Sequence, residues 1–422
     1  MMANDPSQFS RSGAERSLSV RDAAVHVVKE LVRAGHVAYF AGGCVRDRLM
    51  GHEPADYDVA TDAVPEEVTS IFQRAWSVGE AFGVMLVPIS GHRIQVATFR
   101  TDSAYSDSRH PDSVTFSDAQ HDASRRDFTI NGLFENPITG EVIDYVSGRA
   151  DLAARVIRAI GDPQARLRED HLRMLRAIRF MARFSFSLDP ETAEAIREGA
   201  RNLSGVSRER IGEEVKRMLN DPNRAVAAWE MQYHSLDEAV LMEPSQKVAP
   251  TRLGRLPEEV PYPTALAAWL LDRHGETADW QAIATRWADA LMLSNDERSA
   301  MCRAIEVFFI LTGDWNHLGV ARQKRLAAGP GFESGVLLLQ ATDRQLFVDV
   351  RRRVIELSQT GLAPEPLIDG ADLIELGLKP GPLFSRILQA VYDSQLEGSL
   401  PGKDEALALA RAIAHTPTRR GG

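Results

Sequence analysis

The spacing of apolar residues predicts helices and strands in the first third of the chain and helices alone after it. Residues 19–35 (SVRDAAVHVVKELVRAG) carry apolar side chains at helical spacing and end on a glycine, so they predict an amphipathic helix. Residues 37–40 predict a strand that leads into Gly42 and Gly43, and residues 44–50 predict a short helix after these glycines. One more helix and three strands are predicted to follow, at residues 65–74, 76–78, 84–88 and 94–99. This order is typical of a small α+β domain.

The pattern changes after the last of these strands. Residues 101–118 are polar and lack periodicity, which predicts a long loop, and long loops in compact domains are often functional. Residues 138–145 predict a hairpin around a Thr-Gly pair. After about Gly148 no strand is predicted, and from Leu152 onward apolar residues recur with a period near 3.6. We therefore expect an α+β domain followed by all-α domains.

Composition limits the class of protein. The chain has 422 residues, of which 44% are hydrophobic and 26% charged, so we expect a soluble globular protein. Cys44 and Cys302 are too few for a disulfide framework or a zinc cluster, which favours a cytoplasmic location. No run approaches the roughly 18 apolar residues of a membrane span, and the first residues predict a disordered tail, not a signal peptide. With a net charge of −10, any nucleic-acid site must be a local basic patch.

Candidate metal ligands lie in residues 41–61 (AGGCVRDRLMGHEPADYDVAT). If this segment continues as a strand, Asp56 and Asp58 share one face, while Tyr57 and Val59 point into the core. Two carboxylates this close repel each other unless a positive charge lies between them, and a divalent cation is the simplest such charge. The pair therefore predicts a metal site.

Gly42 and Gly43 lie where a predicted strand meets a predicted helix. Such a junction directs backbone N–H groups at one point, which suits a phosphate group. A tight turn without any ligand would also explain two adjacent glycines.

Two later segments concentrate charged residues. Residues 125–131 (RRDFTIN) combine two arginines, an acid and an amide. In residues 164–186, Asp170, Arg173 and Arg176 follow one another at intervals of three, which predicts one face of a helix. A surface helix with ion pairs along its own length would give the same pattern.

These segments together resemble the tRNA nucleotidyltransferase/poly(A) polymerase family, in its bacterial-type (class II) branch. The matching motifs occur in the family's order at residues 42–47 (GGCVRD), 56–58 (DYD), 125–131 (RRDFTIN) and 169–180 (EDHLRMLRAIRF). The resemblance implies an α+β, polymerase-β-like nucleotidyltransferase head followed by all-α neck, body and tail domains. The expected divisions are a disordered tail at 1–18, the head at 19–150, the neck at 151–230, the body at 231–345 and an RNA-binding tail domain at 346–422.

The resemblance also implies an activity. Members of this family extend an RNA 3′ end from nucleoside triphosphates without a nucleic-acid template, so we expect a nucleotidyltransferase that adds C and A (CCA) to tRNA from CTP and ATP. Attack of a 3′-hydroxyl group on an α-phosphate needs the attacking and leaving oxygens to be neutralised, which Mg²⁺ ions on paired carboxylates can do. Asp56 and Asp58 are the expected Mg²⁺ ligands and catalytic residues.

The family's nucleotide contacts map onto several residues here. Gly43 and Arg46 correspond to triphosphate contacts, Arg126 is expected to face the nucleotide, and Asp127 and Asn131 are expected near the ribose. The expected residues of the base-selecting helix are Asp170, Arg173, Arg176 and Arg179.

The chemistry of Asp170 and Arg173 fits a choice of C and A. A carboxylate accepts a hydrogen bond from an exocyclic amine, which C and A carry and U lacks. A guanidinium group donates to the neighbouring ring nitrogen, which is an acceptor in C and A but carries a hydrogen in U and G. Arg176 and Arg179 would continue the same stripe toward the phosphates or the template side chains.

One position departs from the family pattern. A third carboxylate is expected on the strand before the long loop, where this chain has Gln95. Two carboxylates suffice, or another acid such as Asp102 replaces the third, or the activity is reduced; we favour the first.

Other functions remain open from the sequence. A poly(A) polymerase, or an enzyme that adds only CC or only A, would keep the same motifs, and a non-catalytic RNA-binding relative would explain Gln95. The polar loop at 101–118 favours A addition. Basic clusters at 322–325 and 351–353 are candidate RNA contacts, although a solvated face explains them equally well. His234, His274 and His317 stand isolated among helical residues, and no second metal motif is predicted.

Overall fold

The structure is a computed structural model that describes residues 18–79, 83–102, 114–277 and 279–415. The chain divides into two compact units, residues 1–206 and 207–422. The division falls inside the segment 151–230 that was expected to form a separate neck, so the first helices of that segment belong to the same unit as the head. No helix in the described parts is both long and apolar enough to cross a membrane.

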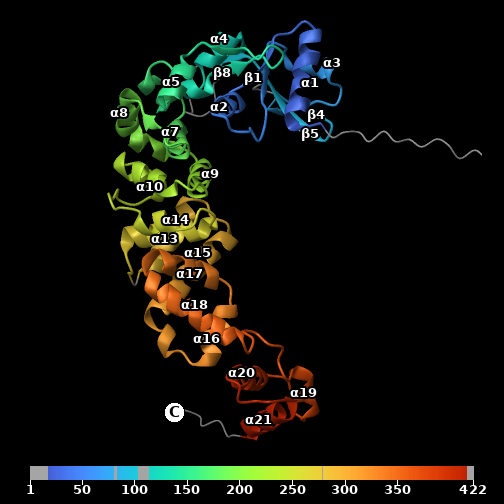
Figure 1. The fold of residues 1–422 in the computed structure, drawn as a ribbon, viewed down its shortest axis with the longest axis vertical. Coiled ribbons are helices and arrows are strands. Elements are labelled where there is room, and N and C mark those ends of the chain that lie inside the picture. The colour runs from blue at the N-terminus through green and yellow to red at the C-terminus, as the bar shows by residue number, and fades with distance from the viewer. Residues whose placement is uncertain (1–17, 80–82, 103–113, 278, 416–422) are drawn as a thin grey trace, which may run out of the picture. The chain divides into compact units, whose positions relative to one another are not determined.

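A mixed seven-stranded sheet forms the centre of the first unit (Figure 1). Its strand order is β3-β4-β5-β2-β1-β8-β9, and β2 and β5 run parallel while the other neighbours are antiparallel. The strands are β1 (Ala38–Ala41), β2 (Val59–Thr61), β3 (Trp76–Gly79), β4 (Val84–Ile89), β5 (His92–Thr98), β8 (Leu133–Glu135) and β9 (Val142–Asp144).

Each face of the sheet packs on its own hydrophobic cluster. On one face, Phe40, Val59 and Val96 pack in a cluster that includes the apolar stripe of α1 (Val20–Arg33). On the other face, Ala41, Ala60 and Phe134 form a cluster with Ala119 and Ala123 of α4 (Ala119–Ser124). Successive residues of a strand point to opposite faces of the sheet. A strand residue whose sequence neighbours belong to the α1-face cluster therefore points to the α4 face.

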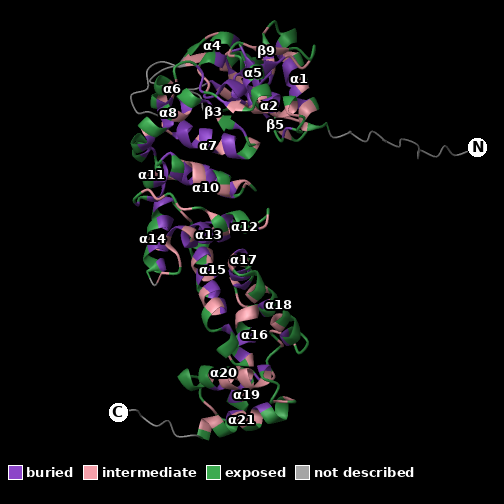
Figure 2. Ribbon diagram, turned by 60° about the vertical axis from the view of Figure 1, so that its left-hand side comes forward, coloured by how far each residue is buried: buried purple, intermediate pink, exposed green. Residues whose placement is uncertain are grey.

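Helices and short strands complete the first unit. The helix α7 (Leu172–Phe184) is mostly buried (Figure 2), with Met174, Leu175 and Ile178 fully inaccessible to solvent. The remaining elements are α2 (Gly43–Leu49), α3 (Pro65–Ile71), β6 (Arg100–Asp102), β7 (Val114–Phe116), η2 (Thr129–Asn131), α5 (Gly148–Ala154), β10 (Val156–Ile157), α6 (Pro163–Glu169), β11 (Ser187–Leu188), α8 (Pro190–Gly199) and η3 (Ala200–Gly205).

The described part of the second unit is helical. Its helices are α9 (Arg208–Leu219), α10 (Arg224–Tyr233), α11 (Asp237–Leu241), α12 (Thr251–Arg255), α13 (Tyr262–His274), α14 (Trp280–Ala290), α15 (Asn295–Gly313), η4 (Trp315–His317), α16 (Val320–Ala328), α17 (Phe332–Thr342), α18 (Arg344–Ser358), α19 (Gly370–Glu375), α20 (Pro382–Leu396) and α21 (Lys403–His415).

The α+β head followed by helices is confirmed, and several details differ from the prediction. The strand expected to carry both aspartates begins only at Val59. The predicted loop at 101–118 starts and ends in a two-stranded pair, β6 with β7, and residues 103–113 between them lie outside the described residues. The hairpin pairs β8 with β9, so its first strand lies before the predicted start at Ile138. The pair β10–β11 is a short sheet within the region predicted to be entirely helical.

Candidate active site

The two aspartates lie immediately before β2. The N–H of Ala41 donates to the backbone oxygen of Asp58 at 3.0 Å, so the sheet pairing continues one residue beyond the strand. Tyr57 is buried and its ring lies 5.0 Å from that of Phe40, whereas Asp56 is exposed and Asp58 half-buried. Tyr57 belongs to the cluster on the α1 face. The predicted alternation is therefore present, and it places both carboxylates on the α4 face.

The environment of Asp58 suits a bound cation. Burial raises the pKa of Asp58 to about 6, the neighbouring Asp56 carboxylate adds to this rise, and the Arg126 guanidinium group opposes it. A partly desolvated carboxylate beside a second one is stabilised when a divalent cation binds to both. The donor set therefore fits a hard metal ion.

Gln95 stands where the family pattern predicts a third carboxylate, and it lies beside Asp58 in the sheet. Val59 of β2 is in register with Val96 of β5, so Gln95 stands one position back, beside Asp58. Ile94 and Val96 belong to the α1-face cluster, which puts Gln95 on the same face as Asp58. In the described parts of the chain no group of three or more His, Cys, Asp or Glu side chains is arranged to hold a metal ion. The predicted metal ligands, Asp56 and Asp58, are two carboxylates beside a neutral Gln95.

The turn after β1 needs glycine for two reasons. Gly42 has a φ of +72°, a conformation that L side chains rarely adopt. A Cβ atom at Gly42 would also lie 2.7 Å from a guanidinium nitrogen of Arg126. The turn thus places Gly42 against Arg126 and Gly43, the first residue of α2, against Arg46.

A chain of hydrogen bonds connects α2 with α7. Arg46 donates to the side-chain oxygen of Asn131, whose amide group donates to Asp127 Oδ1 at 3.0 Å. Arg176 donates to Asp127 Oδ2 through Nε at 2.9 Å and Nη2 at 2.6 Å. Burial by itself would raise the pKa of Asp127, but Arg176, Asn131 and the Phe128 N–H lower it to about 2. Asp127 is therefore ionised, and with Asn131 it positions two arginines.

Arg46 and Arg126 are each held by an acid and an aromatic ring. Arg46 donates to Asp47 Oδ1 at 2.6 and 2.8 Å and lies over the ring of Phe184, 4.6 Å from its centroid. Burial lowers the pKa of Arg46. Arg126 donates to Asp122 at 2.9 and 3.2 Å, and its guanidinium carbon lies 4.9 Å from the ring centroid of Phe134.

The predicted base-selecting pair does not lie on one helix face. Helix α6 ends at Glu169 and α7 begins at Leu172, so Asp170 lies in the turn, where its Oδ1 accepts from the Leu172 N–H at 3.1 Å. Arg173 is in the first turn of α7 and donates to the carboxylate of Glu169 and to the backbone oxygen of Arg166. The prediction of a common helical face is therefore wrong for Asp170.

The other two arginines of the stripe lie further along α7. Arg176 and Arg179 are half-buried, and the guanidinium carbon of Arg179 lies 4.2 Å from the ring centroid of Phe180. Arg46 also lies over this ring, at 5.3 Å. The predicted arginines of α2 and α7 are thus brought together in the first unit.

Sequence reasoning missed two acids that hold these arginines. Asp122 is buried and pairs with both Arg125 and Arg126. Glu169 pairs with Arg173. The spacings of three and four residues between these acids and arginines were the available signal.

The basic clusters of the second unit are largely paired. Lys324 is buried and donates to Thr360 Oγ1, and Arg325 pairs with Asp393 at 2.6 Å. Arg351, Arg352 and Arg353 each pair with a carboxylate, at 2.6, 3.3 and 3.0 Å. The prediction that residues 322–325 contact RNA is therefore wrong for Lys324, which is buried.

Two of the histidines described as isolated have acidic neighbours. His274 and Glu243 are 3.2 Å apart at the edge of a buried ion-pair network that also contains Arg273 and Asp237. His234 is buried, 3.5 Å from Glu230. Both histidines lie within the folded helical unit.

Fold and site together define a nucleotidyltransferase: a mixed sheet carries a carboxylate pair beside a glycine turn and a group of ordered arginines. A family profile described as "Poly A polymerase head domain" matches residues 38–158, and one described as "Probable RNA and SrmB- binding site of polymerase A" matches residues 185–245.

Whole-length relatives narrow this class. The chain is 32% identical over 398 residues to a CCA-adding enzyme of Lactobacillus delbrueckii subsp. bulgaricus, covering 92% of this chain and 97% of the relative. It is 34% identical over 392 residues to the CCA-adding enzyme of Enterococcus faecalis, covering 91% and 94%. The crystal structure of the Bacillus stearothermophilus CCA-adding enzyme in complex with CTP superimposes with a TM-score of 0.75 at 27% identity, covering 94% of this chain and 98% of that one. The chain belongs to the CCA-adding family of tRNA nucleotidyltransferases.

Proposed function

We propose that this protein adds C, C and A to the 3′ end of tRNA, using CTP and ATP and no nucleic-acid template. The observation that carries the proposal is the arrangement of Asp56 and Asp58 on the sheet face that Arg126 also approaches, with the arginines of α2 and α7 in the same unit. Whole-length relatives named as CCA-adding enzymes support it.

The carboxylate pair would hold Mg²⁺. Asp56 and Asp58 provide the hard oxygen ligands that this ion prefers. When bound, Mg²⁺ supplies positive charge for the attacking and leaving oxygens of the transfer. Cys44 lies behind the pair, and its pKa is raised to about 12 by burial and by Asp58, so it stays a neutral thiol and adds no competing charge.

The arginines would bind the triphosphate. Gly43 presents its backbone N–H at the turn, and Arg46 and Arg126 provide guanidinium groups whose positions are fixed by Asp47 and Asp122. Asp127 and Asn131, which we expected near the ribose, position Arg46 and Arg176 through their hydrogen bonds. Preorganised donors of this kind stabilise the charge that develops on the leaving pyrophosphate.

Asp170 and Arg173 would read the base. A carboxylate that accepts from the exocyclic amine and a guanidinium group that donates to the adjacent ring nitrogen accept C and A and reject U and G. Glu169 and the backbone oxygen of Arg166 orient Arg173 for this task. Arg179 would continue the stripe of arginines on α7 from Arg173 toward the phosphates of the nucleotide.

Three other activities are weaker candidates. A poly(A) polymerase and an enzyme that adds only CC or only A would use the same residues, and the relatives' names favour the full CCA reaction. A non-catalytic RNA-binding relative is disfavoured because both aspartates are present.

The two cysteines are too few for a disulfide framework, which supports a cytoplasmic location for the proposed CCA-adding enzyme.

Incubation with tRNA that lacks its CCA end tests the proposal. With Mg²⁺ and labelled CTP and ATP, the expected products carry two C residues and then one A, and extension then stops. An open-ended A tail would instead assign a poly(A) polymerase, products that stop after CC or that gain only A would assign a partial activity, and no incorporation would assign a binding protein.

A further inference from the structure

The guanidinium group of Arg166 joins α6 to two other segments of the first unit. Arg166 lies in the middle of α6, and its side chain is only 13% exposed. Its Nη1 donates to the backbone oxygen of Arg125 at 3.0 Å, and its Nη2 donates to the backbone oxygen of Ser124. Its Nε donates to the backbone oxygen of Ile160 at 3.1 Å. One side chain thus holds its helix against backbone from both sides of the head's last strands.

The acceptors of these hydrogen bonds have fixed positions. Helix α4 ends at Ser124, and the last carbonyl groups of a helix have no donor within that helix. A guanidinium group presents five N–H donors in a rigid planar fork, so it can serve several such oxygens at once. The N–H of Ile160 donates to the backbone oxygen of Asp127 at 3.2 Å, so the two segments that Arg166 contacts also pair with each other. Arg166 therefore connects α6 to a part of the fold that is already ordered.

Arg166 and Arg173 share two acceptors. Nη1 of Arg166 donates to the Oε2 atom of Glu169 at 2.8 Å, and Arg173 donates to the same oxygen. Nη2 of Arg173 donates to the backbone oxygen of Arg125 at 3.4 Å, which is also an acceptor of Arg166. The position of the Arg173 guanidinium group therefore depends on that of Arg166.

The turn that carries Asp170 is connected to the head separately from α7. Asp170 lies between the end of α6 and the start of α7. Further along α7, Arg176 donates to Asp127 at 2.6 and 2.9 Å, which holds the helix itself. The Arg166 contacts instead tie the end of α6 to the backbone just before Arg126. They therefore fix the turn relative to the proposed triphosphate contact.

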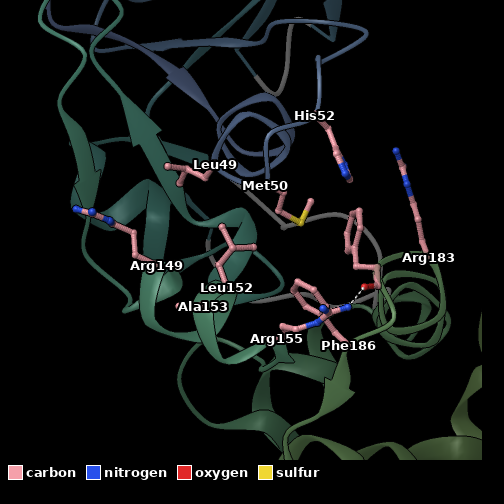
Figure 3. A pocket seen from close by; sticks show the side chains of 10 residues that line it. Leu49, Met50, His52, Arg149, Leu152, Ala153, Arg155, Arg183 and Phe186 are labelled. Carbon is pink, nitrogen blue, oxygen red and sulfur yellow. Dashed lines mark hydrogen bonds between the residues drawn. The ribbon is translucent and has the colours of Figure 1, made fainter.

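The opposite end of α7 borders a pocket. This pocket has a volume of about 520 Å³ and lies among the end of α2, α5 and the end of α7 (Figure 3), with Arg155 and Arg183 among its lining residues. The walls of a pocket lack the packing contacts that a filled interior provides. None of the four acceptors of Arg166 described above lines it. The position of the Asp170 turn is therefore set at the start of α7 and not at its end.

We propose that Arg166 is a positioning residue for base selection, which sets the separation between the base-reading residues, Asp170 and Arg173, and the triphosphate contact Arg126. The base and the triphosphate belong to one molecule, so a nucleotide engages both sets of residues only when their separation matches its length. Arg166 acts through these residues, since each of its three side-chain nitrogen atoms donates to a protein oxygen. This proposal rests on the proposed function for the roles of the residues that Arg166 positions.

The direct test is the equilibrium binding of CTP and of UTP to the full-length protein in the presence of Mg²⁺, measured by isothermal titration calorimetry. The wild type is expected to bind CTP more tightly than UTP. Arg166→Met should reduce this preference by about tenfold, because the donors that hold the base-reading residues are lost. The affinity for inorganic pyrophosphate, which has no base, should change by less than about threefold, because the guanidinium groups of Arg46 and Arg126 remain.

Two further variants complete the test. Arg168→Met is the matched control, because Arg168 lies in the same helix, is exposed, and donates to the backbone oxygen of Gln164 within that helix. It should keep the preference of the wild type. Arg166→Lys keeps the charge, but one ammonium group cannot serve all four acceptors, so this variant should lose about threefold of the preference. Circular dichroism checks the fold of each variant, and Arg166→Lys carries the test if Arg166→Met does not fold.

The outcomes separate the positioning role from a structural one and from the proposed function. A wild-type preference for CTP in both Arg166 variants would overturn the positioning role. Equal losses of affinity for CTP, UTP and pyrophosphate would also overturn it, and would assign Arg166 to folding. Equal binding of CTP and UTP by a wild type that still adds CCA to tRNA would overturn the positioning role alone. If the wild type prefers CTP but incorporates no nucleotide, and Arg166→Met loses the preference, the proposed function fails while the positioning role stands.

Discussion

Buried arginines serve different purposes in the two units. In the second unit, Arg273 is fully buried, and its donors are taken up by Glu243, Asp237 and Gln232. Arg224 likewise donates to three backbone oxygens. These arginines tie segments of the second unit together.

In the first unit the arginines are held as fully: Arg46 donates to Asp47 and Asn131, and Arg126 donates to Asp122 and to the backbone oxygen of Asn131. Acids fix Arg46 and Arg126, while aromatic rings cover part of each guanidinium group. Arg126 lies close enough to the Asp56–Asp58 pair to lower the pKa of Asp58. Burial of an arginine alone therefore does not identify a site; the nearby Asp56–Asp58 pair does. Changes in the first unit should affect activity, and changes in the second should affect stability.

The largest effect is expected for Asp58→Asn. Loss of one of two metal ligands should lower the rate of CMP incorporation by about a thousandfold or more, since such ions supply several kcal/mol of stabilisation to the transition state. The melting temperature should not fall, because the change removes a repulsive charge. Asp62→Asn, just beyond the other end of β2, keeps the acceptor for the Val37 N–H and should retain activity. Near-normal incorporation by Asp58→Asn would refute the assigned metal site.

In the second unit the largest effect should be on stability. Arg273→Met leaves Asp237 and Glu243 buried without their shared cation and should cost about 3–5 kcal/mol of unfolding free energy. Arg286→Met is the control: Arg286 touches the same Glu243 at 3.1 Å but is 44% exposed, so its loss should cost less than about 1 kcal/mol. Denaturant unfolding measures both. Equal costs would show that burial does not distinguish these ion pairs.

Lowering the pH should destabilise the buried ion-pair network around Glu243 and Arg273. Burial opposes ionisation of Glu243, but His274, Trp287 and Arg273 lower its pKa from 4.5 to about 2. This carboxylate therefore stabilises the fold above its unfolded pKa, and the contribution is lost as the pH falls from about 4.5 toward about 2. Between about pH 5 and pH 3 the melting temperature of the wild type should fall more steeply than that of Glu243→Gln. Parallel curves would exclude Glu243 as a source of the acid sensitivity.

The smallest effect is expected for Gln95→Glu. If the carboxylate pair is sufficient, a third carboxylate beside Asp58 should change the turnover by less than about threefold, because the added ligand also adds repulsion. Steady-state incorporation of CMP measures this. A sharp rise in turnover would mean that the native metal site is a weakened one.

The sequence predicted the parts of the fold that have strong periodicity. The α1 helix, the strands from β3 to β5 and the helical character of the later chain follow from apolar spacing. The alternation around Tyr57 predicted the common face of the aspartates although the strand starts later, because a buried tyrosine imposes the same alternation on extended backbone.

The parts that could not be predicted depend on contacts distant in the sequence. Strands β10 and β11 have two residues each, too short for a pattern. Neither glycine nor proline marks the break between α6 and α7, so Asp170 was placed on a helix that it only precedes. The roles of Asp127 and Asn131 come from a network that joins α2 to α7 across the fold.

Base choice by protein side chains is the central claim, and single-nucleotide incorporation tests it most directly. Initial rates with CTP and with UTP should be measured for the wild type and for Asp170→Ala on tRNA that lacks its CCA end. Asp170→Ala should reduce the preference for CTP over UTP by about tenfold or more, through loss of the acceptor for the exocyclic amine, while its dependence on Mg²⁺ stays the same. An unchanged preference for CTP would contradict the assignment of Asp170 to base selection.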